Sequence, residues 1–432
     1  MTPMPLLILG LAAALIPPGA LTSDERALTA FIDKDNDHAL ALLERVVNIN
    51  SGTMNLAGVR EVGVAFRAEL DALGFKTEWV DGAPFERAGH LVAEHPGSGP
   101  RILLIGHLDT VFEPHSPFQK FERISPTAAK GPGVTDMKGG NVVMIQALKA
   151  LQSVGLLKPM NIVVVMTGDE ESGGRPLSLS RAALVKAGRG ADVAIGFEDG
   201  DGNPTTAVIA RRGTTNWELR VKGKPAHSSQ IFNAENGYGA IFEASRILNA
   251  FREKLSGQPH LTFNPGVIVG GTSVEYDAPA SQGTGFGKSN VIAEYTVVTG
   301  DVRALSPDQF VAAQKSMQDI VAASLPQTSA TLTFDDGYPA LAPKAGNERL
   351  LALYNQASLD VGAGPVVAVD PDKAGAADAS FVAEQVKMIL DGVGLMGSGG
   401  HTVEETADLR TLPSMTKRIA VLLARLQRDG AK

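Results

Sequence analysis

Ile102-Leu103-Leu104-Ile105-Gly106-His107-Leu108-Asp109 joins a run of apolar residues directly to a histidine and an aspartate. Similar apolar runs, bounded by glycine, proline or aspartate, occupy residues 162–166 and 193–197. Runs of this length are typical of strands that are buried on both faces. Helical stretches such as residues 139–155 and 177–188 separate them. The sequence therefore predicts an α/β domain with a mostly parallel sheet covered by helices.

The pattern changes near residue 213, where residues 217–222 alternate apolar with polar side chains, as in a half-exposed strand. The elements expected next are a helix at 234–254, strands at 261–270 and 290–303, a helix opened by the capping box Ser306-Pro307-Asp308-Gln309, and a strand at 330–335. This β-α-β-β-α-β order predicts a ferredoxin-like α+β unit.

After residue 340 the chain returns to the pattern of buried strands separated by helices. We expect a helix at 347–358, buried strands at 366–369 and 388–390, and a final helix at about 404–428. Two amphipathic helices, at 25–48 and 57–74, precede the first strand of this domain. A chain of 432 residues is long enough for two domains. We therefore expect a discontinuous first domain, residues 23–213 and 334–432, with residues 214–333 inserted into it.

Composition narrows the classes of function. The net charge of −8 and the pI near 5.6 argue against a nucleic-acid partner, because no basic stripe exists to neutralise phosphates. Small anionic substrates remain compatible with this charge. The chain has no cysteine, so nitrogen and oxygen side chains must hold any metal ion.

The amino terminus carries an apolar run at residues 5–16, which is too short to span a bilayer. Pro17-Pro18-Gly19-Ala20 follows it and offers a cleavage site. We therefore expect residues 1–22 to be a signal peptide and the mature protein to be periplasmic or secreted. Residues 1–4 lack lysine and arginine, and the alternative is a frayed or membrane-tethering tail, or a cytoplasmic protein. No other segment is long and apolar enough to cross a membrane.

His107 and Asp109 follow an expected strand at its carboxyl end, where open α/β sheets bind ligands. Two residues apart on an extended segment, their side chains point the same way. His107 can therefore bind a metal ion, while Asp109 contacts a neighbouring metal ligand, and not the ion, and orients it. The alternative is a solvated turn.

Asp136 lies in a turn between Gly131-Pro132-Gly133-Val134 and Gly139-Gly140, just before an expected helix. Its two carboxylate oxygens suit it to bridge two cations. The alternative is a helix N-cap.

Gly168-Asp169-Glu170-Glu171-Ser172-Gly173 places three adjacent acids after a buried run, which is costly unless cations or solvent neutralise them. Because adjacent side chains diverge, Glu171 can bind metal while Glu170 faces a water molecule. The alternative is a solvated acidic loop. Glu198, with Asp199 as the fallback, and His401 after a glycine-rich loop complete the set of candidate ligands.

The inserted unit offers fewer candidates. His227 lies in the turn Gly223-Lys224-Pro225-Ala226-His227-Ser228-Ser229, and Asn290 and Arg303 flank an expected strand. Without further information, the simplest interpretation is that His227 is an exposed histidine in a turn and that Arg303 forms a surface ion pair.

These motifs, in this order and spacing from about residue 35 to the carboxyl terminus, resemble a family of di-zinc peptidases and deacylases. The family includes glutamate carboxypeptidases of the carboxypeptidase G type, aminoacylase and succinyl-diaminopimelate desuccinylase. The matching stretches are those around His107, Asp136, Glu170, His227 and His401.

The resemblance implies two Zn²⁺ ions per subunit, with Co²⁺ or Mn²⁺ as substitutes. His107, Asp136 and Glu198 would hold one ion, and Glu171, His401 and the shared Asp136 the other. It also implies that Glu170 is the general base, that Asp109 orients His107, and that the peptide bond between Asp136 and Met137 is cis.

The resemblance further implies a homodimer formed through residues 214–333. His227 would reach the active site of the second copy and stabilise the oxyanion. Asn290 and Arg303 would bind the substrate, Arg303 at a free carboxylate. The chain departs from the family at Ala374-Gly375-Ala376-Ala377-Asp378-Ala379, which lacks a hydroxyl that relatives often have, and Lys373 is the nearby candidate to replace it.

The implied function is hydrolysis of an amide bond in a small peptide or N-acyl amino acid that carries a free carboxylate, most like a glutamate carboxypeptidase. The alternatives are a deacylase or dipeptidase of the same family, and a non-catalytic relative that binds metal.

Overall fold

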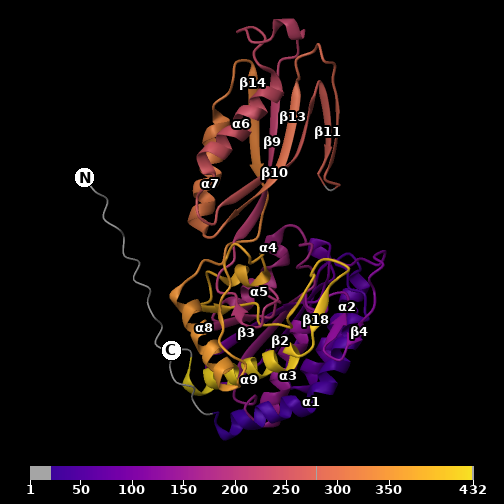
Figure 1. The fold of residues 1–432 in the computed structure, drawn as a ribbon, viewed down its shortest axis with the longest axis vertical. Helices are drawn as coiled ribbons and strands as arrows, with labels where there is room; N and C mark the ends of the chain where they lie inside the picture. Colours follow the sequence, from indigo (N-terminus) through magenta and orange to yellow (C-terminus); the bar gives the residue numbers. More distant parts are fainter. Residues whose placement is uncertain (1–20, 279, 431–432) are drawn as a thin grey trace, which may run out of the picture.

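The computed structural model describes residues 21–278 and 280–430, and Figure 1 shows them as two lobes. The predicted signal peptide lies outside these residues, apart from its last two positions. Both ends of the chain build one lobe, and the middle of the chain builds the other (Figure 1). None of the described helices combines the length and hydropathy needed to cross a bilayer.

The first lobe contains a mixed sheet of order β1-β2-β6-β3-β7-β16. Its parallel strands are β6 (Asn161–Thr167), β3 (Arg101–His107), β7 (Val193–Gly196) and β16 (Met388–Leu390). The antiparallel strands are β2 (Gly89–His95), which pairs with β6, and β1 (Lys76–Asp81), which pairs with β2 at the edge of the sheet. The sequence pattern did not reveal either strand. The prediction of a mostly parallel sheet is confirmed.

Alternate residues of the central strands enter two different cores. Ile102 and Leu104 pack into the core beneath the helices α1, α3 and α9, whereas Leu103 and Ile105 pack into the core beneath α5. Because both faces are covered, the four consecutive positions 102–105 of β3 are all apolar. The covering helices are α1 (Ser23–Val47), α2 (Leu56–Ala72), α3 (Lys138–Ser153), α4 (Leu177–Ser180), α5 (Ala182–Gly188), α8 (Ala345–Asp360) and α9 (Thr411–Asp429).

Two sequence predictions in this lobe are wrong. The final helix begins at Thr411 and not near residue 404, because Thr406–Asp408 forms the strand β18 and pairs with β5 (Ala128–Lys130). These tertiary contacts override local helix propensity. Residues 366–369 are not a buried strand of the main sheet: only β15 (Val367–Ala368) forms there, Val367 is exposed, and β15 pairs with β8 (Thr206–Ala207). The remaining elements are η1 (Ala83–Phe85), η3 (Asp378–Val382), β4 (Glu122–Ser125) and β17 (Gly397–Ser398).

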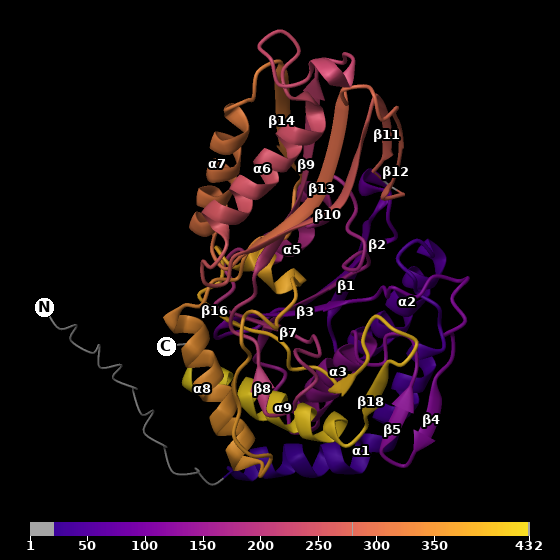
Figure 2. The same ribbon diagram turned by 45° about the horizontal axis from the view of Figure 1, so that its top comes forward.

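The second lobe contains an antiparallel sheet of order β10-β13-β9-β14, with α6 and α7 on one side (Figure 2). Its elements are β9 (Gly213–Gly223), η2 (Ser228–Gln230), α6 (Gly239–Leu255), β10 (Thr262–Gly271), β13 (Tyr295–Ala304), α7 (Pro307–Ala322) and β14 (Thr328–Phe334). This order and topology confirm the predicted ferredoxin-like unit. An additional hairpin, β11 (Ser273–Asp277) and β12 (Gln282–Phe286), lies beside β10 and was not predicted. The exact domain limits stay a prediction.

The predicted cap of α7 is half correct. The Ser306 hydroxyl accepts the N–H of Gln309, as expected, but the Gln309 side chain accepts the N–H of Leu305 instead of that of Ser306. The chain enters and leaves the second lobe through two adjacent segments, which pair at Arg211 with Leu341 and at Thr214 with Tyr338.

Candidate metal centre

The predicted metal ligands come from five chain segments that the fold brings to one edge of the main sheet. His107 ends β3, Glu171 follows β6, and Glu198 follows β7. Carboxyl ends of neighbouring parallel strands share one edge, so these side chains converge. Asp136 precedes α3, and His401 lies between β17 and β18.

Gly140 allows the close packing that brings Asp136 to this edge. A Cβ atom at Gly140 would lie 1.9 Å from the carbonyl oxygen of Phe197, so α3 can approach the end of β7 only with glycine at this position. The peptide bond between Asp136 and Met137 is cis, which confirms the prediction.

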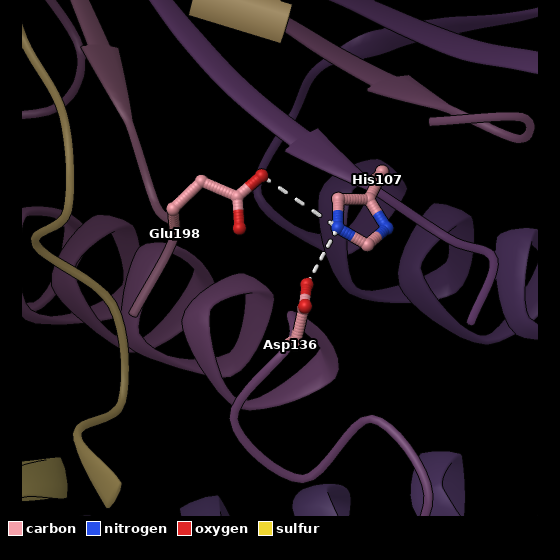
Figure 3. Close-up of side chains that lie close together, drawn as sticks. All are labelled: His107, Asp136 and Glu198. Carbon is pink, nitrogen blue, oxygen red and sulfur yellow. Dashed lines mark hydrogen bonds and ion pairs between the residues drawn. The ribbon is translucent and has the colours of Figure 1, made fainter. Parts of the chain in front are cut away.

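His107, Asp136 and Glu198 form the first group of ligand-type side chains (Figure 3). The Nε2 atom of His107 lies 3.0 Å from Oδ1 of Asp136 and 3.6 Å from Oε1 of Glu198. Of the two adjacent acids that follow β7, it is therefore Glu198, and not the fallback Asp199, that lies beside His107.

Asp136, Glu171 and His401 form the second group. The Nε2 atom of His401 lies 2.9 Å from Oδ2 of Asp136 and 3.1 Å from Oε2 of Glu171. Asp136 thus turns one carboxylate oxygen to each group, as a bridging ligand must. The His401 side chain is 59% exposed and that of His107 is 1% exposed, so the second group is the solvent-facing one.

The acids of this centre carry more negative charge than the buried surroundings tolerate. Burial raises the pKa of Glu198 and of Glu170 well above the usual range. Burial, followed by the charge of Asp136, raises the pKa of Glu171 to about 7. Hydrogen bonds to Asp136 and Glu171 raise the pKa of His401 to about 11. Raised pKa values of this kind indicate that these acids lack a positively charged partner close by.

The residues present fit a pair of divalent cations. Among the described side chains, Oε1 of Glu171 is buried without a hydrogen-bond partner, although a carboxylate oxygen buried in this way is costly. The donors are imidazole and carboxylate, with no thiolate, which suits zinc and its first-row neighbours.

Asp109 connects the His107 strand to the loop that carries Glu170. Its carboxylate accepts the N–H groups of Glu170, at 3.0 Å, and of Glu171, at 3.1 Å, and the hydroxyl of Thr53, at 2.6 Å. Nδ1 of His107 lies 3.1 Å from the Asp109 carbonyl oxygen and 3.4 Å from its carboxylate. Although burial opposes ionisation, the hydrogen bond with His107 and the other bonds lower the pKa of Asp109.

Glu405 was not predicted to belong to the site. Its buried carboxylate accepts the N–H groups of Gly133 at 3.0 Å, Thr135 at 2.8 Å and Asp136 at 3.2 Å. It thereby fixes the turn that presents Asp136. In the sequence, Glu405 is marked only by its position in the motif that begins at His401. The spacing of that motif does not show which way the Glu405 side chain points.

The third acid of the cluster after β6 is neutralised within the fold. Asp169 is fully buried, and its carboxylate accepts a hydrogen bond of 2.6 Å from the guanidinium of Arg181. Asp378, in the segment 374–379, accepts hydrogen bonds from Arg181 and Thr167. The Lys373 side chain is exposed.

The three candidates of the second lobe lie apart from these groups. His227 is exposed, and its Nδ1 lies 2.8 Å from the Ser229 hydroxyl. The carbonyl of Asn290 accepts the N–H of Ser228, so Asn290 is a neighbour of His227. Arg303 is paired with Asp301 at 3.0 Å. No described contact joins these residues to the five ligand-type side chains, and their roles stay predictions.

His260, Asp370 and Asp372 form one more group of ligand-type side chains. These residues are largely exposed, and the guanidinium of Arg212 lies 3.5 Å from the Asp372 carboxylate. That positive charge opposes binding of a cation.

A centre with two groups of nitrogen and oxygen ligands, one shared carboxylate and a spare, half-buried glutamate defines a metal-dependent hydrolase of the dinuclear class. The sequence pattern of the peptidase family M20/M25/M40 matches residues 103–426. The chain belongs to this peptidase family. The predicted class, a metal-dependent peptidase or amidohydrolase, is confirmed, and so is the resemblance from which it came.

Carboxypeptidase G2 of Pseudomonas sp. (strain RS-16) is 26% identical over 411 residues, which cover 93% of each chain. Acetylornithine deacetylase of Pasteurella multocida (strain Pm70) is 30% identical over 219 residues, 48% of this chain and 54% of that protein. A dinuclear metal binding peptidase of Bacillus subtilis has the same fold, with a TM-score of 0.63 and 15% identity over 92% of this chain and 99% of that one.

Proposed function

We propose that this chain is a carboxypeptidase similar to carboxypeptidase G2, which releases an amino acid with a free carboxylate from a small peptide or N-acyl amino acid. The observation that carries the proposal is the division of the Asp136 oxygens between two ligand groups, with the Glu170 carboxylate left over. Similarity to carboxypeptidase G2 over 93% of both chains favours this activity above that of the deacetylase, which matches 48% of the chain.

The two ligand groups would each hold one divalent cation, with Asp136 between them. A cation pair in such a site lowers the pKa of a shared water molecule from about 15.7 toward 7 and polarises the carbonyl group of the substrate. We propose Zn²⁺ as the working metal because of the imidazole and carboxylate donors, with Co²⁺ or Mn²⁺ as substitutes.

Glu170 is proposed as the general base. Its carboxylate accepts a proton from the attacking water molecule, and the water oxygen bonds to the amide carbon. Glu170 then delivers that proton to the amide nitrogen as the carbon–nitrogen bond breaks. Burial by itself raises the pKa of Glu170. The positive charge of the two cations would oppose this rise and favour the ionised carboxylate, which is the form that accepts a proton.

Asp109 supports both His107 and Glu170. It keeps His107 oriented through Nδ1, and it holds the peptide N–H of Glu170. Because the Asp109 carboxylate contacts both residues, it fixes the position of Glu170 relative to His107 and the first ligand group.

The second lobe is proposed to bind the rest of the substrate. Arg303 suits the free carboxylate, because a guanidinium binds a carboxylate through two parallel hydrogen bonds. To do so it must exchange or share its present partner, Asp301. His227 and Asn290 lie on two exposed segments that pair with each other. We propose that His227 serves the oxyanion in a second copy of the chain, in a dimer formed through residues 214–333.

We also propose that the protein is exported, on the basis of the apolar run at residues 5–16. Determination of the amino terminus of protein purified from the native host tests this proposal. Export predicts a terminus near residue 22, and a terminus at Met1 contradicts it.

The proposed activity is tested with a panel of acyl-amino acids, dipeptides and folate-like glutamates, read by mass spectrometry. We expect release of one class of carboxyl-terminal amino acid. The Glu170→Gln variant should lose at least about a hundredfold in kcat while its metal content stays unchanged. Glu94→Gln, whose side chain is exposed, is the matched control.

Two results would change the assignment. Preferential removal of a short acyl group from an amino nitrogen would favour a deacylase. Full activity of Glu170→Gln, or hydrolysis of no amide by the metal-loaded protein, would contradict the proposed function itself.

A further inference from the structure

The peptide groups on both sides of the Glu170 Cα atom are held by side chains from distant parts of the chain. The N–H of Glu170 donates to the Asp109 carboxylate at 3.0 Å. The carbonyl of Glu170 accepts the hydroxyl hydrogen of Tyr338 at 2.7 Å. Asp109 also accepts the N–H of Glu171, so the peptide group that follows Glu170 is held by Asp109 at its N–H and by Tyr338 at its carbonyl.

Tyr338 belongs to the segment through which the chain leaves the second lobe. Its carbonyl oxygen accepts the N–H of Thr214, which lies in the segment that enters this lobe. A Cβ atom at Gly213 would lie 2.6 Å from the Tyr338 carbonyl oxygen and 2.6 Å from the nitrogen of Ala340. The two segments therefore pack tightly at the junction of the lobes, and Tyr338 is fixed within it.

Arg181 determines the direction of the Tyr338 hydrogen bond. Its guanidinium, 1% exposed, donates to the Tyr338 oxygen at 2.7 Å. Because Arg181 has only donors, the Tyr338 oxygen must accept from it, and the single Tyr338 hydrogen must go to Glu170. Arg181 also donates to the carbonyl of Asp169 at 3.0 Å and to the Asp378 carboxylate at 2.7 Å, so it is itself held in place.

A second contact joins the same two parts of the molecule. The guanidinium of Arg175, five residues beyond Glu170, donates to the carbonyl of Asp336, two residues before Tyr338. The loop that carries Glu170 is thus attached twice to the segment that leaves the second lobe.

We propose that Tyr338 is a positioning residue that couples the placement of the second lobe to the orientation of Glu170. A shift of the junction moves Tyr338, and Tyr338 moves the peptide group that follows Glu170. Small displacements of a catalytic group lower the rate of the chemical step more than they lower binding. The inference rests on the general-base role proposed for Glu170.

The test compares Tyr338→Phe with Tyr354→Phe in the metal-loaded full chain. Both variants remove one hydroxyl, and that of Tyr354 lies 3.8 Å from the sulfur of Met415, with the guanidinium of Arg418 as a further neighbour. For Tyr338→Phe we expect kcat to fall about tenfold, with KM within twofold and the metal content unchanged. Tyr354→Phe should keep its kcat. Equal kcat values for the two variants would overturn the proposal.

A double-mutant cycle tests the coupling itself. Gly213→Ala pushes against the Tyr338 carbonyl and should lower kcat alone, but it should have little further effect in the Tyr338→Phe background. Effects that multiply would overturn the coupling. If Tyr338→Phe does not fold, Gly213→Ala alone decides, and an unchanged kcat overturns the proposal.

Glu170→Gln in the same assays separates this inference from the proposed function. Loss of activity in Glu170→Gln beside an unchanged Tyr338→Phe overturns only the role of Tyr338. An active Glu170→Gln overturns the general-base role and the inference that rests on it.

Discussion

At the residue scale, the centre depends on the placement of Asp136. One of its oxygens lies 3.0 Å from His107 and the other 2.9 Å from His401, although these histidines belong to the two separate chain segments that build the first lobe. The Asp136 side chain cannot serve both groups unless its turn is fixed. Glu405 supplies this constraint through three backbone N–H groups, including that of Asp136 itself.

Glu405→Gln should therefore weaken metal binding without removing a ligand. The new amide keeps one acceptor but places an NH₂ group against backbone donors, so at least one N–H of the turn loses its partner. We expect a loss of about 10- to 100-fold in metal affinity, as for other residues that orient metal ligands. Titration of metal-free protein, followed by calorimetry, measures this. Glu404→Gln is the control, because Glu404 is exposed, and equal affinities for the two variants would contradict the role of Glu405.

Some of the site could be predicted from local sequence and some could not. His107, Glu171 and Glu198 were predictable because each follows an apolar run that had to be a buried strand. Arg181 and Tyr338 carry no such signal, because their contact joins residues 157 positions apart. Glu405 was expected in a helix, and only its burial against the Asp136 turn explains the extended chain there.

At the element scale, α1 and α9 are joined by charges at the edge of the core. Glu25 on α1 accepts hydrogen bonds from Arg425 at 2.8 Å and from the N–H of Thr22. Burial opposes ionisation of Glu25, but the hydrogen bonds from Arg425 and Thr22 and the charges of Arg425 and Arg428 outweigh it and lower the pKa. The ionised form is therefore bound more tightly in the folded state than in the unfolded one.

This lowered pKa predicts a pH-dependent contribution to stability. The stabilisation is fully present above the ordinary pKa near 4.5 and is lost as the pH falls through the lower pKa of the folded state. Glu25→Gln should thus lower the free energy of unfolding by about 1.5–3 kcal/mol at pH 7, and the difference from wild type should shrink below pH 4.5. Denaturant titrations between pH 7 and pH 3 measure it, with the exposed Glu61→Gln as control. A difference that stays constant across this range would contradict the assignment.

The elements themselves were predictable where burial is uniform. Strands β3, β6 and β7 are apolar at every central position because a core lies on each face. Strand β1 is mostly polar and lies at the edge of the sheet, and every position of β12 is exposed, so neither carries the apolar run that marks β3, β6 and β7. Their positions follow from pairing with strands that are distant in the sequence.

At the scale of the whole molecule, the metal centre joins segments from both ends of the chain. Removal of metal should therefore destabilise the entire first lobe, because buried acids such as Glu171 and Glu198 would lose their counter-charge. At free metal near 1,000 times the dissociation constant, binding contributes about 4 kcal/mol. We expect chelation to abolish hydrolysis and to lower the unfolding temperature by several degrees, both reversed by Zn²⁺.

The exposed group at His260 supplies the control for that experiment. In His260→Ala the metal-dependent shift of the unfolding temperature should be the same as in wild type, since Arg212 opposes cation binding there. A shift that disappears in His260→Ala would place the stabilising metal outside the centre around Asp136.

The most direct test of the central claim is anomalous diffraction at the zinc edge from crystals of the metal-loaded protein. The account predicts two peaks about 3.5–4 Å apart on either side of the Asp136 carboxylate, one beside His107 and Glu198 and the other beside Glu171 and His401. A single peak, or peaks that do not share Asp136, would contradict it.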